Sequence, residues 1–162
     1  MLEFCGLEKV TLDANGRLKF SPRFLADFQN YEANEIVFHC LPEGALGIYP
    51  LIRWEEMKAE ESRNSTQGQS SLLQRRQRRL MGAMTQKDKL SNQGRVTLPV
   101  MFRDLCSLSA GEEIVVLGCE VGVELWNAAA WAKEMSLMQG HSLEKGENEM
   151  IADLVVANDT EK

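Results

Sequence analysis

Two short segments of this 162-residue chain combine an arginine with residues that can hold it in a fixed pose. The first, D-A-N-G-R at residues 13–17, contains Asn15-Gly16, a pair that favours a tight turn because both residues tolerate positive φ. In such a turn Asp13 can accept from loop N–H groups or pair with Arg17, which fixes the guanidinium. A fixed guanidinium binds phosphate, or guanine O6 and N7, in a bidentate manner. The segment is therefore compatible with nucleic-acid binding, although its spacing alone is more typical of a plain turn with a solvated ion pair.

The second segment, S-N-Q-G-R at residues 91–95, repeats this order 78 residues later. Ser91 can bond the loop backbone but cannot pair with Arg95 as an anion, so Arg95 is expected to be held less firmly. The spacing alone favours plain turns with solvated charges, whereas the duplication, together with the family resemblance given below, favours DNA contact. The candidate DNA-binding residues of the two loops and the adjoining strand are Asp13, Asn15, Gly16, Arg17, Lys19, Gln93, Gly94 and Arg95.

A third basic segment lies between these loops. Residues 72–81 have a helical pattern and carry Arg75, Arg76, Arg78 and Arg79. As a DNA face, each neutralised phosphate would steepen the salt dependence of binding by ~0.9. As an interface, the arginines would pair with acids on a neighbouring helix or subunit, at Glu55, Glu56, Glu60 and Glu61. The interface role is slightly favoured.

Composition excludes several classes of protein. The formal net charge is −6, which argues against a generic polycation that coats nucleic acid. No apolar run approaches the ~18 residues that a membrane-spanning helix needs, and the acidic segment at residues 1–5 lacks an apolar core, so we expect no secretory signal. The four cysteines have no C-x-x-C spacing, which favours reduced thiols in a cytoplasm. His39 and His141 are the only histidines and no catalytic motif occurs, so we expect no enzyme, cofactor, metal site or small-molecule substrate.

An internal repeat organises the chain. At the same offset of 78, Phe24 corresponds to Phe102, and the segment at 35–37 recurs at 113–115. In each copy the order of apolar runs, turn residues and helix-capping residues predicts a β-β-α-β-β-α unit. The expected boundaries are a first repeat at 1–57, a linker loop and Arg-rich helix at 58–84, a second repeat at 85–138 and an acidic tail at 139–162.

The remaining aromatic and polar segments fit this plan. The large aromatic side chains match between copies, so they are expected in the core rather than as base-stacking platforms: Phe24, Trp54, Phe102, Trp126 and Trp131. His39 lies in an apolar strand, where a satisfied core histidine is the simpler interpretation. The polar stretch at 60–71 predicts a mobile loop. Residues 144–162 carry six acidic and two basic side chains.

The loops and their surroundings together resemble the MraZ family over about residues 1–135. The segments that carry the resemblance are D-A-N-G-R at 13–17, the arginines of 75–79, L-M-G-A at 80–83, N-Q-G-R-V-T-L-P at 92–99, I-Y-P at 48–50 with Trp54, and E-L-W at 124–126 with Trp131. Ser91 and the position of Pro22 depart from the family pattern.

The resemblance implies an α+β fold of two AbrB-like (SpoVT-AbrB) swapped-hairpin units related by a pseudo-two-fold axis. It also implies a cytoplasmic, nucleoid-associated regulator that forms a ring-shaped homo-oligomer. The ring would bind DNA at repeated boxes upstream of division and cell-wall genes through its D-x-x-x-R loops. Two alternatives stay open: an oligomeric protein-interaction module that has lost or weakened DNA binding, and an AbrB-type antitoxin partner, which two fused copies disfavour.

Overall fold

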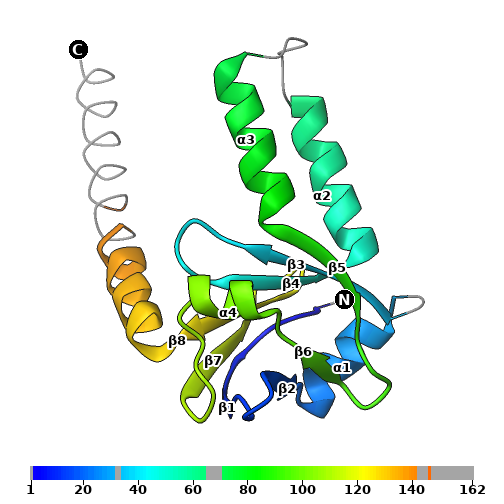
Figure 1. Ribbon diagram of the computed structural model, residues 1–162, viewed down its shortest axis with the longest axis vertical. Coiled ribbons are helices and arrows are strands. Elements are labelled where there is room, and N and C mark those ends of the chain that lie inside the picture. Colours follow the sequence, from blue (N-terminus) through cyan, green and yellow to red (C-terminus); the bar gives the residue numbers. More distant parts are fainter. Residues whose placement is uncertain (1, 32–33, 65–70, 142–145, 147–162) are drawn as a thin grey trace, which may run out of the picture. The chain divides into compact units, whose positions relative to one another are not determined.

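The computed structural model describes residues 2–31, 34–64, 71–141 and 146, and it divides the chain into compact units at 1–128 and 129–162. In the second unit the structure describes a helix through residue 141. The first unit mixes helices with antiparallel strands, so the α+β prediction is confirmed (Figure 1). The rest of the tail, at 142–145 and 147–162, lies outside the described residues.

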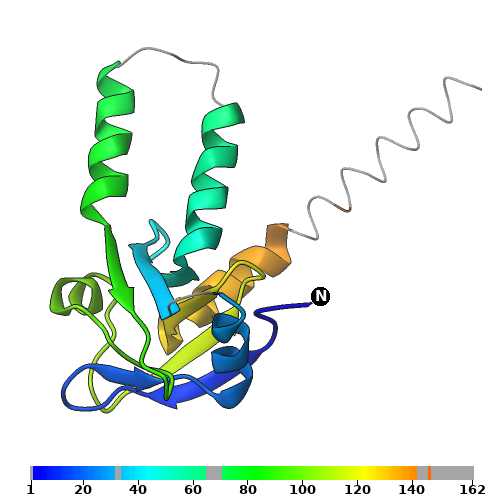
Figure 2. The same cartoon turned by 90° about the vertical axis from the view of Figure 1, so that its right-hand side faces the viewer.

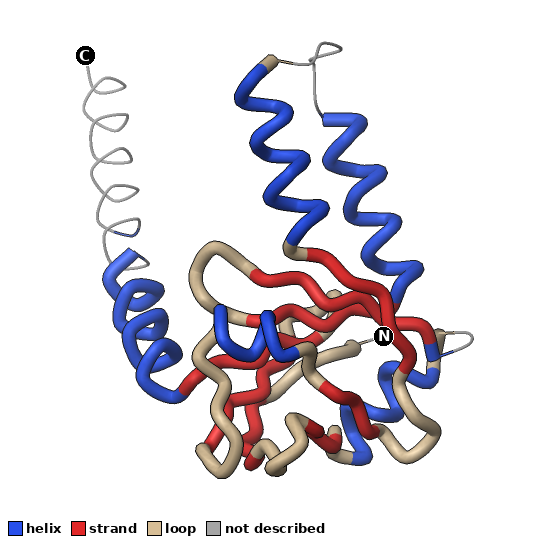
Figure 3. The backbone as a smooth tube through the Cα atoms, in the orientation of Figure 1, coloured by secondary structure: helices blue, strands red, loops and turns tan. Residues whose placement is uncertain are grey.

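Strands of the first unit form two sheets, coloured red in Figure 3. All strand neighbours are antiparallel. A two-stranded ribbon joins β2 (Arg17–Lys19) to β6 (Arg95–Thr97). The six-stranded sheet has, in spatial order, β1 (Leu7–Thr11), β7 (Glu113–Gly118), β8 (Val123–Asn127), β4 (Leu46–Pro50), β3 (Glu35–Cys40) and β5 (Thr85–Lys89).

The two halves of this unit exchange strands. β1 pairs with β7 from the second half, and β5 pairs with β3 from the first. Leu7 lies opposite Leu117 and Thr85 opposite His39, so the two pairings have the same register after the 78-residue shift. β4 and β8 pair across the junction of the halves. The pairing therefore follows a two-fold pattern along the sequence.

The exchange also determines which strands pair beside the predicted Asn15-Gly16 turn. The turn forms, but the strands on either side of it do not pair with each other as in a simple hairpin. β2 has only three residues, too few to support a stable local pair. Pairing with the apolar strand β7 instead lets β1 join a sheet whose inner face is buried.

Four helices surround or extend from the sheets: α1 (Pro22–Gln29), α2 (Leu51–Asn64), α3 (Leu72–Ala83) and α4 (Val100–Leu105). α2 and α3 stand side by side and project away from the sheet, at the end opposite to the β2–β6 ribbon (Figures 1 and 2). The loop predicted from Glu60 is wrong as far as Asn64, because α2 continues there through residues with high helix propensity and a Lys58–Glu61 ion pair of 2.8 Å. Residues 65–70 of that predicted loop lie outside the described residues.

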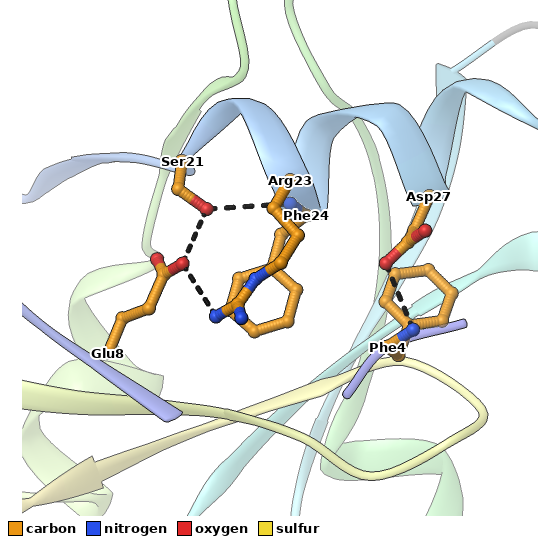
Figure 4. Close-up of polar contacts among 6 residues, drawn as sticks. All are labelled: Phe4, Glu8, Ser21, Arg23, Phe24 and Asp27. Carbon is orange, nitrogen blue, oxygen red and sulfur yellow. Dashed lines mark hydrogen bonds and ion pairs between the residues drawn. The ribbon is translucent and has the colours of Figure 1, made fainter. Parts of the chain in front are cut away.

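Helix α1 is tied to the chain's N-terminal segment by two carboxylates (Figure 4). Glu8 of β1 accepts from Ser21 Oγ at 2.7 Å and from Arg23 Nη2 at 2.8 Å. Ser21 is the N-cap of α1 and accepts from the Phe24 amide. Asp27 accepts from the Phe4 amide at 3.0 Å. These bonds fix the end of β2 relative to β1.

The core is built from matching positions of both halves. Phe24, Phe102 and Trp126 are buried as predicted, whereas Trp54 and Trp131 are half-buried. His39 is also buried and its Nδ1 lies 3.0 Å from Thr85 Oγ1. Because the Thr85 hydroxyl donates to the Met81 carbonyl, it accepts from the histidine. The prediction of a satisfied core histidine is therefore confirmed.

His39 makes the stability of the fold depend on pH. Burial, and secondarily the Lys58 charge, lower the pKa of His39 below its usual 6.5. The unfolded chain then binds the proton more readily, so the stabilisation is present above pH 6.5 and is lost as the pH falls. We expect the midpoint temperature of thermal unfolding to decrease when the pH is lowered from 7.5 to 5.5, and to decrease less in His39→Gln. The exposed His141 offers a matched control, since His141→Gln should keep the full pH dependence. Equal pH dependence in His39→Gln and the parent protein would contradict this assignment.

Candidate nucleic-acid interface

Asp13 closes the first loop through both of its carboxylate oxygens. Oδ1 accepts from the amides of Asn15 and Arg17 at 2.8 and 2.9 Å. Oδ2 accepts from Arg17 Nε at 3.0 Å, so Asp13 fills both roles that the sequence suggested. The amide of Arg17, followed by smaller hydrogen-bond contributions, lowers the pKa of Asp13. The carboxylate therefore stays ionised at neutral pH and holds the Arg17 guanidinium in place.

The second loop repeats the backbone of the first without its ion pair. The amide of Ser91 donates to the Arg95 carbonyl at 3.0 Å, as Asp13 donates to Arg17 at 3.1 Å. Ser91 Oγ accepts from the Arg95 amide at 2.9 Å. A serine hydroxyl has one uncharged oxygen, so Ser91 cannot form with the Arg95 guanidinium the ion pair that Asp13 forms with Arg17.

Each loop is fastened to the strand that follows the other loop. The Leu98 amide donates to the Gly16 carbonyl at 2.8 Å, and the Phe20 amide donates to the Gly94 carbonyl at 2.9 Å. Both glycines are buried and have positive φ, +75° and +82°, which other residues rarely adopt. The two loops and the β2–β6 ribbon therefore form one connected surface. Asn15 and Gln93 lie exposed at the two tips.

The ribbon separates an apolar face from a basic face. Leu18 and Val96 are buried, while the alternate residues are exposed. Lys19 lies directly opposite Arg95, and Arg17 lies opposite Thr97. Like charges at directly opposed positions are unfavourable, since their Cβ atoms lie only about 4.5–5.5 Å apart. Among the residues that the structure describes, neither Lys19 nor Arg95 has a carboxylate within ion-pair distance.

A shallow depression of about 300 Å³ opens on this basic face. Its described lining residues include the Asp13 carboxylate and three cationic side chains. The full set is Thr11, Asp13, Arg17, Leu18, Lys19 and Arg95. An anion placed there would offset the mutual repulsion of Lys19 and Arg95. Elsewhere in the described part of the chain, no group of three or more metal-ligating side chains comes together.

The four arginines of the third segment lie apart from the loops. Arg75, Arg76, Arg78 and Arg79 are all exposed on α3, which projects from the opposite end of the unit (Figure 1). Two of the acids expected to pair with them are bonded within α2, as Arg53–Glu56 at 3.1 Å and Lys58–Glu61 at 2.8 Å. The structure thus brings together the loop residues but not the α3 arginines.

Arg103 is a site residue that the sequence reasoning missed. It lies on α4, half-buried, and its guanidinium packs against Gly16 of the first loop. A Cβ built on Gly16 would lie 2.5 Å from the guanidinium carbon of Arg103. No sequence signal pointed to it. The matching residue 78 positions earlier is the uncharged Leu25, and the contact of Leu25 with Gly94 of the second loop is itself seen only in the structure.

Asp13 should order its loop more than Ser91 orders the second loop. We expect Asp13→Ala to accelerate amide hydrogen exchange at both Asn15 and Arg17, because one oxygen accepts from both amides. The matched variant Ser91→Ala should accelerate exchange at Arg95. Residue-resolved hydrogen exchange measures both effects, and unchanged exchange of the Arg17 amide in Asp13→Ala would contradict the role of Asp13.

Known proteins are similar to this chain over most of its length. A family model described as "MraZ protein, putative antitoxin-like" matches residues 81–154. A protein named transcriptional regulator MraZ from Hydrogenovibrio crunogenus is 31% identical over 133 residues, covering 81% of this chain and 84% of that protein. Its namesake from Alkalilimnicola ehrlichii is 31% identical over 129 residues, covering 79% and 83%.

A third relative with the same name, from Marinomonas sp., extends the match further. It is 28% identical over 154 residues, covering 93% of this chain and 98% of that protein. Across the described helices, none combines the length and apolarity needed to cross a membrane. With identities of 31% over more than three quarters of its length, the chain belongs to the MraZ family.

Proposed function

We propose that this protein is a DNA-binding transcriptional regulator, and that DNA contacts the exposed face of the β2–β6 ribbon and the two loops beside it. One observation carries the proposal. Lys19 and Arg95 lie opposite each other in solvent, and Arg17 lies beside Lys19 on the same face, with Asp13 as the one carboxylate lining the depression between them. An exposed cationic face of this kind fits a phosphate backbone. The relatives are named as regulators rather than as enzymes, and we propose no catalytic activity.

The exchange of strands supports a more specific proposal about architecture. Two AbrB-like swapped-hairpin units, at 1–57 and 85–138, would account for the shared register of β1–β7 and β5–β3. The segment at 58–84 would then be a linker with an Arg-rich helix between the units, whose exposed α3 arginines would take part in contacts between subunits. The acidic segment at 139–162 would follow the second unit.

Assembly would compensate for the small size of each DNA contact. One ribbon presents only a few cations, so a single chain should bind weakly. A ring-shaped homo-oligomer on repeated boxes would raise the avidity by ~10² or more where the spacing fits. We propose that such boxes lie upstream of division and cell-wall genes, and that the protein acts in the cytoplasm on nucleoid DNA.

Substitution of the two loop arginines tests this function. We expect Arg17→Ala to weaken binding by about 1–3 kcal/mol, roughly 5- to 150-fold, because Asp13 holds that guanidinium ready for contact. Arg95→Ala should have a smaller effect, since Ser91 stands in place of the carboxylate that positions Arg17 in the first loop. Fluorescence anisotropy with the duplex upstream of the protein's own coding sequence, at two salt concentrations, measures both.

The matched control is Arg76→Ala on α3, which should leave affinity for DNA close to that of the parent protein. Equal losses in Arg17→Ala and Arg95→Ala would contradict the asymmetry of the loops. Absence of saturable binding at low salt, from protein shown to be folded, would overturn the proposed function and favour an oligomeric protein-interaction module.

A further inference from the structure

The two loops are fastened alike but rest on chemically different side chains. The reciprocal bonds from Leu98 to Gly16 and from Phe20 to Gly94 hold both loops in equivalent positions, each above one side chain that we call its seat. Under Gly94 that seat is the Leu25 side chain, whose Cδ2 would lie 3.2 Å from an added Cβ. Under Gly16 it is the guanidinium of Arg103. The repeat therefore places a cation in one half where it places an alkyl group in the other.

The polar groups of Arg103 are incompletely satisfied. Its Nε is buried and, within the part of the chain that the structure describes, has no hydrogen-bond partner. No ion pair joins it to a described carboxylate. Arg23 on α1 shows the contrasting case, because Glu8 accepts from its guanidinium at 2.8 Å (Figure 4). A half-buried guanidinium without an anion is unfavourable for folding, so packing alone does not explain why this position holds arginine.

The first loop needs side-chain cations if it is to bind an anion. Its amides at Asn15 and Arg17 donate to the Asp13 carboxylate, and the Gly16 amide donates to the Asp13 carbonyl. These N–H groups are therefore occupied and do not form an anion nest. Asp13 also offsets part of the Arg17 charge. A second cation against Gly16 restores the net positive charge of this loop.

We propose that Arg103 is a second cation of the first loop's phosphate site, and that it makes this loop the stronger DNA contact of the two. The proposal rests on the proposed function and deepens it. Arg103 packs against the loop that carries Arg17, so its field adds to that of Arg17 at the same phosphate. Among the described residues, the second loop has neither a carboxylate within ion-pair distance of Arg95 nor a cation beneath Gly94.

The internal repeat supplies a test with a built-in structural control. Arg103→Leu places at α4 the side chain that already fills the equivalent seat at Leu25. We expect affinity for the upstream duplex to fall about tenfold at low salt, and the slope of log K against log salt to become shallower by about 0.9 for each Arg103 engaged. The affinity of Arg103→Leu for a scrambled duplex of equal length should fall by the same factor relative to the parent protein, because phosphates carry no sequence information. Arg103→Lys should recover part of the loss.

The reverse exchange, Leu25→Arg, should steepen the salt slope by adding a cation under the second loop. Circular dichroism and light scattering on each variant show that fold and assembly persist. If the parent protein binds the duplex while Arg103→Leu, folded and assembled, keeps the parent affinity and salt slope, this inference is overturned and the proposed function stands. If the parent protein itself fails to bind, the proposed function falls first. If Arg103→Leu does not fold, the outcome for Leu25→Arg decides, and an unchanged slope there overturns the inference.

Discussion

The reciprocal hydrogen bonds at Gly16 and Gly94 determine where every cation of the candidate interface lies. They join each loop to the strand that follows the other loop, at 2.8 and 2.9 Å, and so hold together a ribbon whose strands have only three residues each. A ribbon this short depends on its surroundings for stability. Burial of Leu18 and Val96 beneath it, and the exchange of β1 and β5 between the halves, supply that support.

The same arrangement explains how an acidic chain can present a basic surface. The net charge of −6 belongs to the whole sequence, whereas the ribbon concentrates Arg17, Lys19 and Arg95 on one exposed face. Steering of DNA depends on the local field rather than on the total charge. The two-fold pattern of the backbone does not extend to the chemistry, because Ser91 replaces the carboxylate of one loop and Arg103 underlies only the other.

Local sequence signals predicted the parts of the molecule that short-range interactions determine. The two glycine turns and the matched core aromatics Phe24 and Phe102 are of this kind. The exchange of strands could not be read from spacing, since an Asn-Gly turn fits either a local hairpin or an exchanged one. Arg103 was missed for a related reason: its contact with Gly16 exists only once the exchange brings the second half of the chain against the first.

The central claim is that DNA binds the ribbon and its loops, at the end of the unit away from α2 and α3. Hydrogen–deuterium exchange of the full chain, with and without a saturating duplex from upstream of its coding sequence, tests this directly. The account predicts that DNA slows exchange mainly in peptides covering residues 13–19 and 91–97, and that peptides covering 72–83 change little. Protection concentrated on 72–83, with the two loops unaffected, would contradict it.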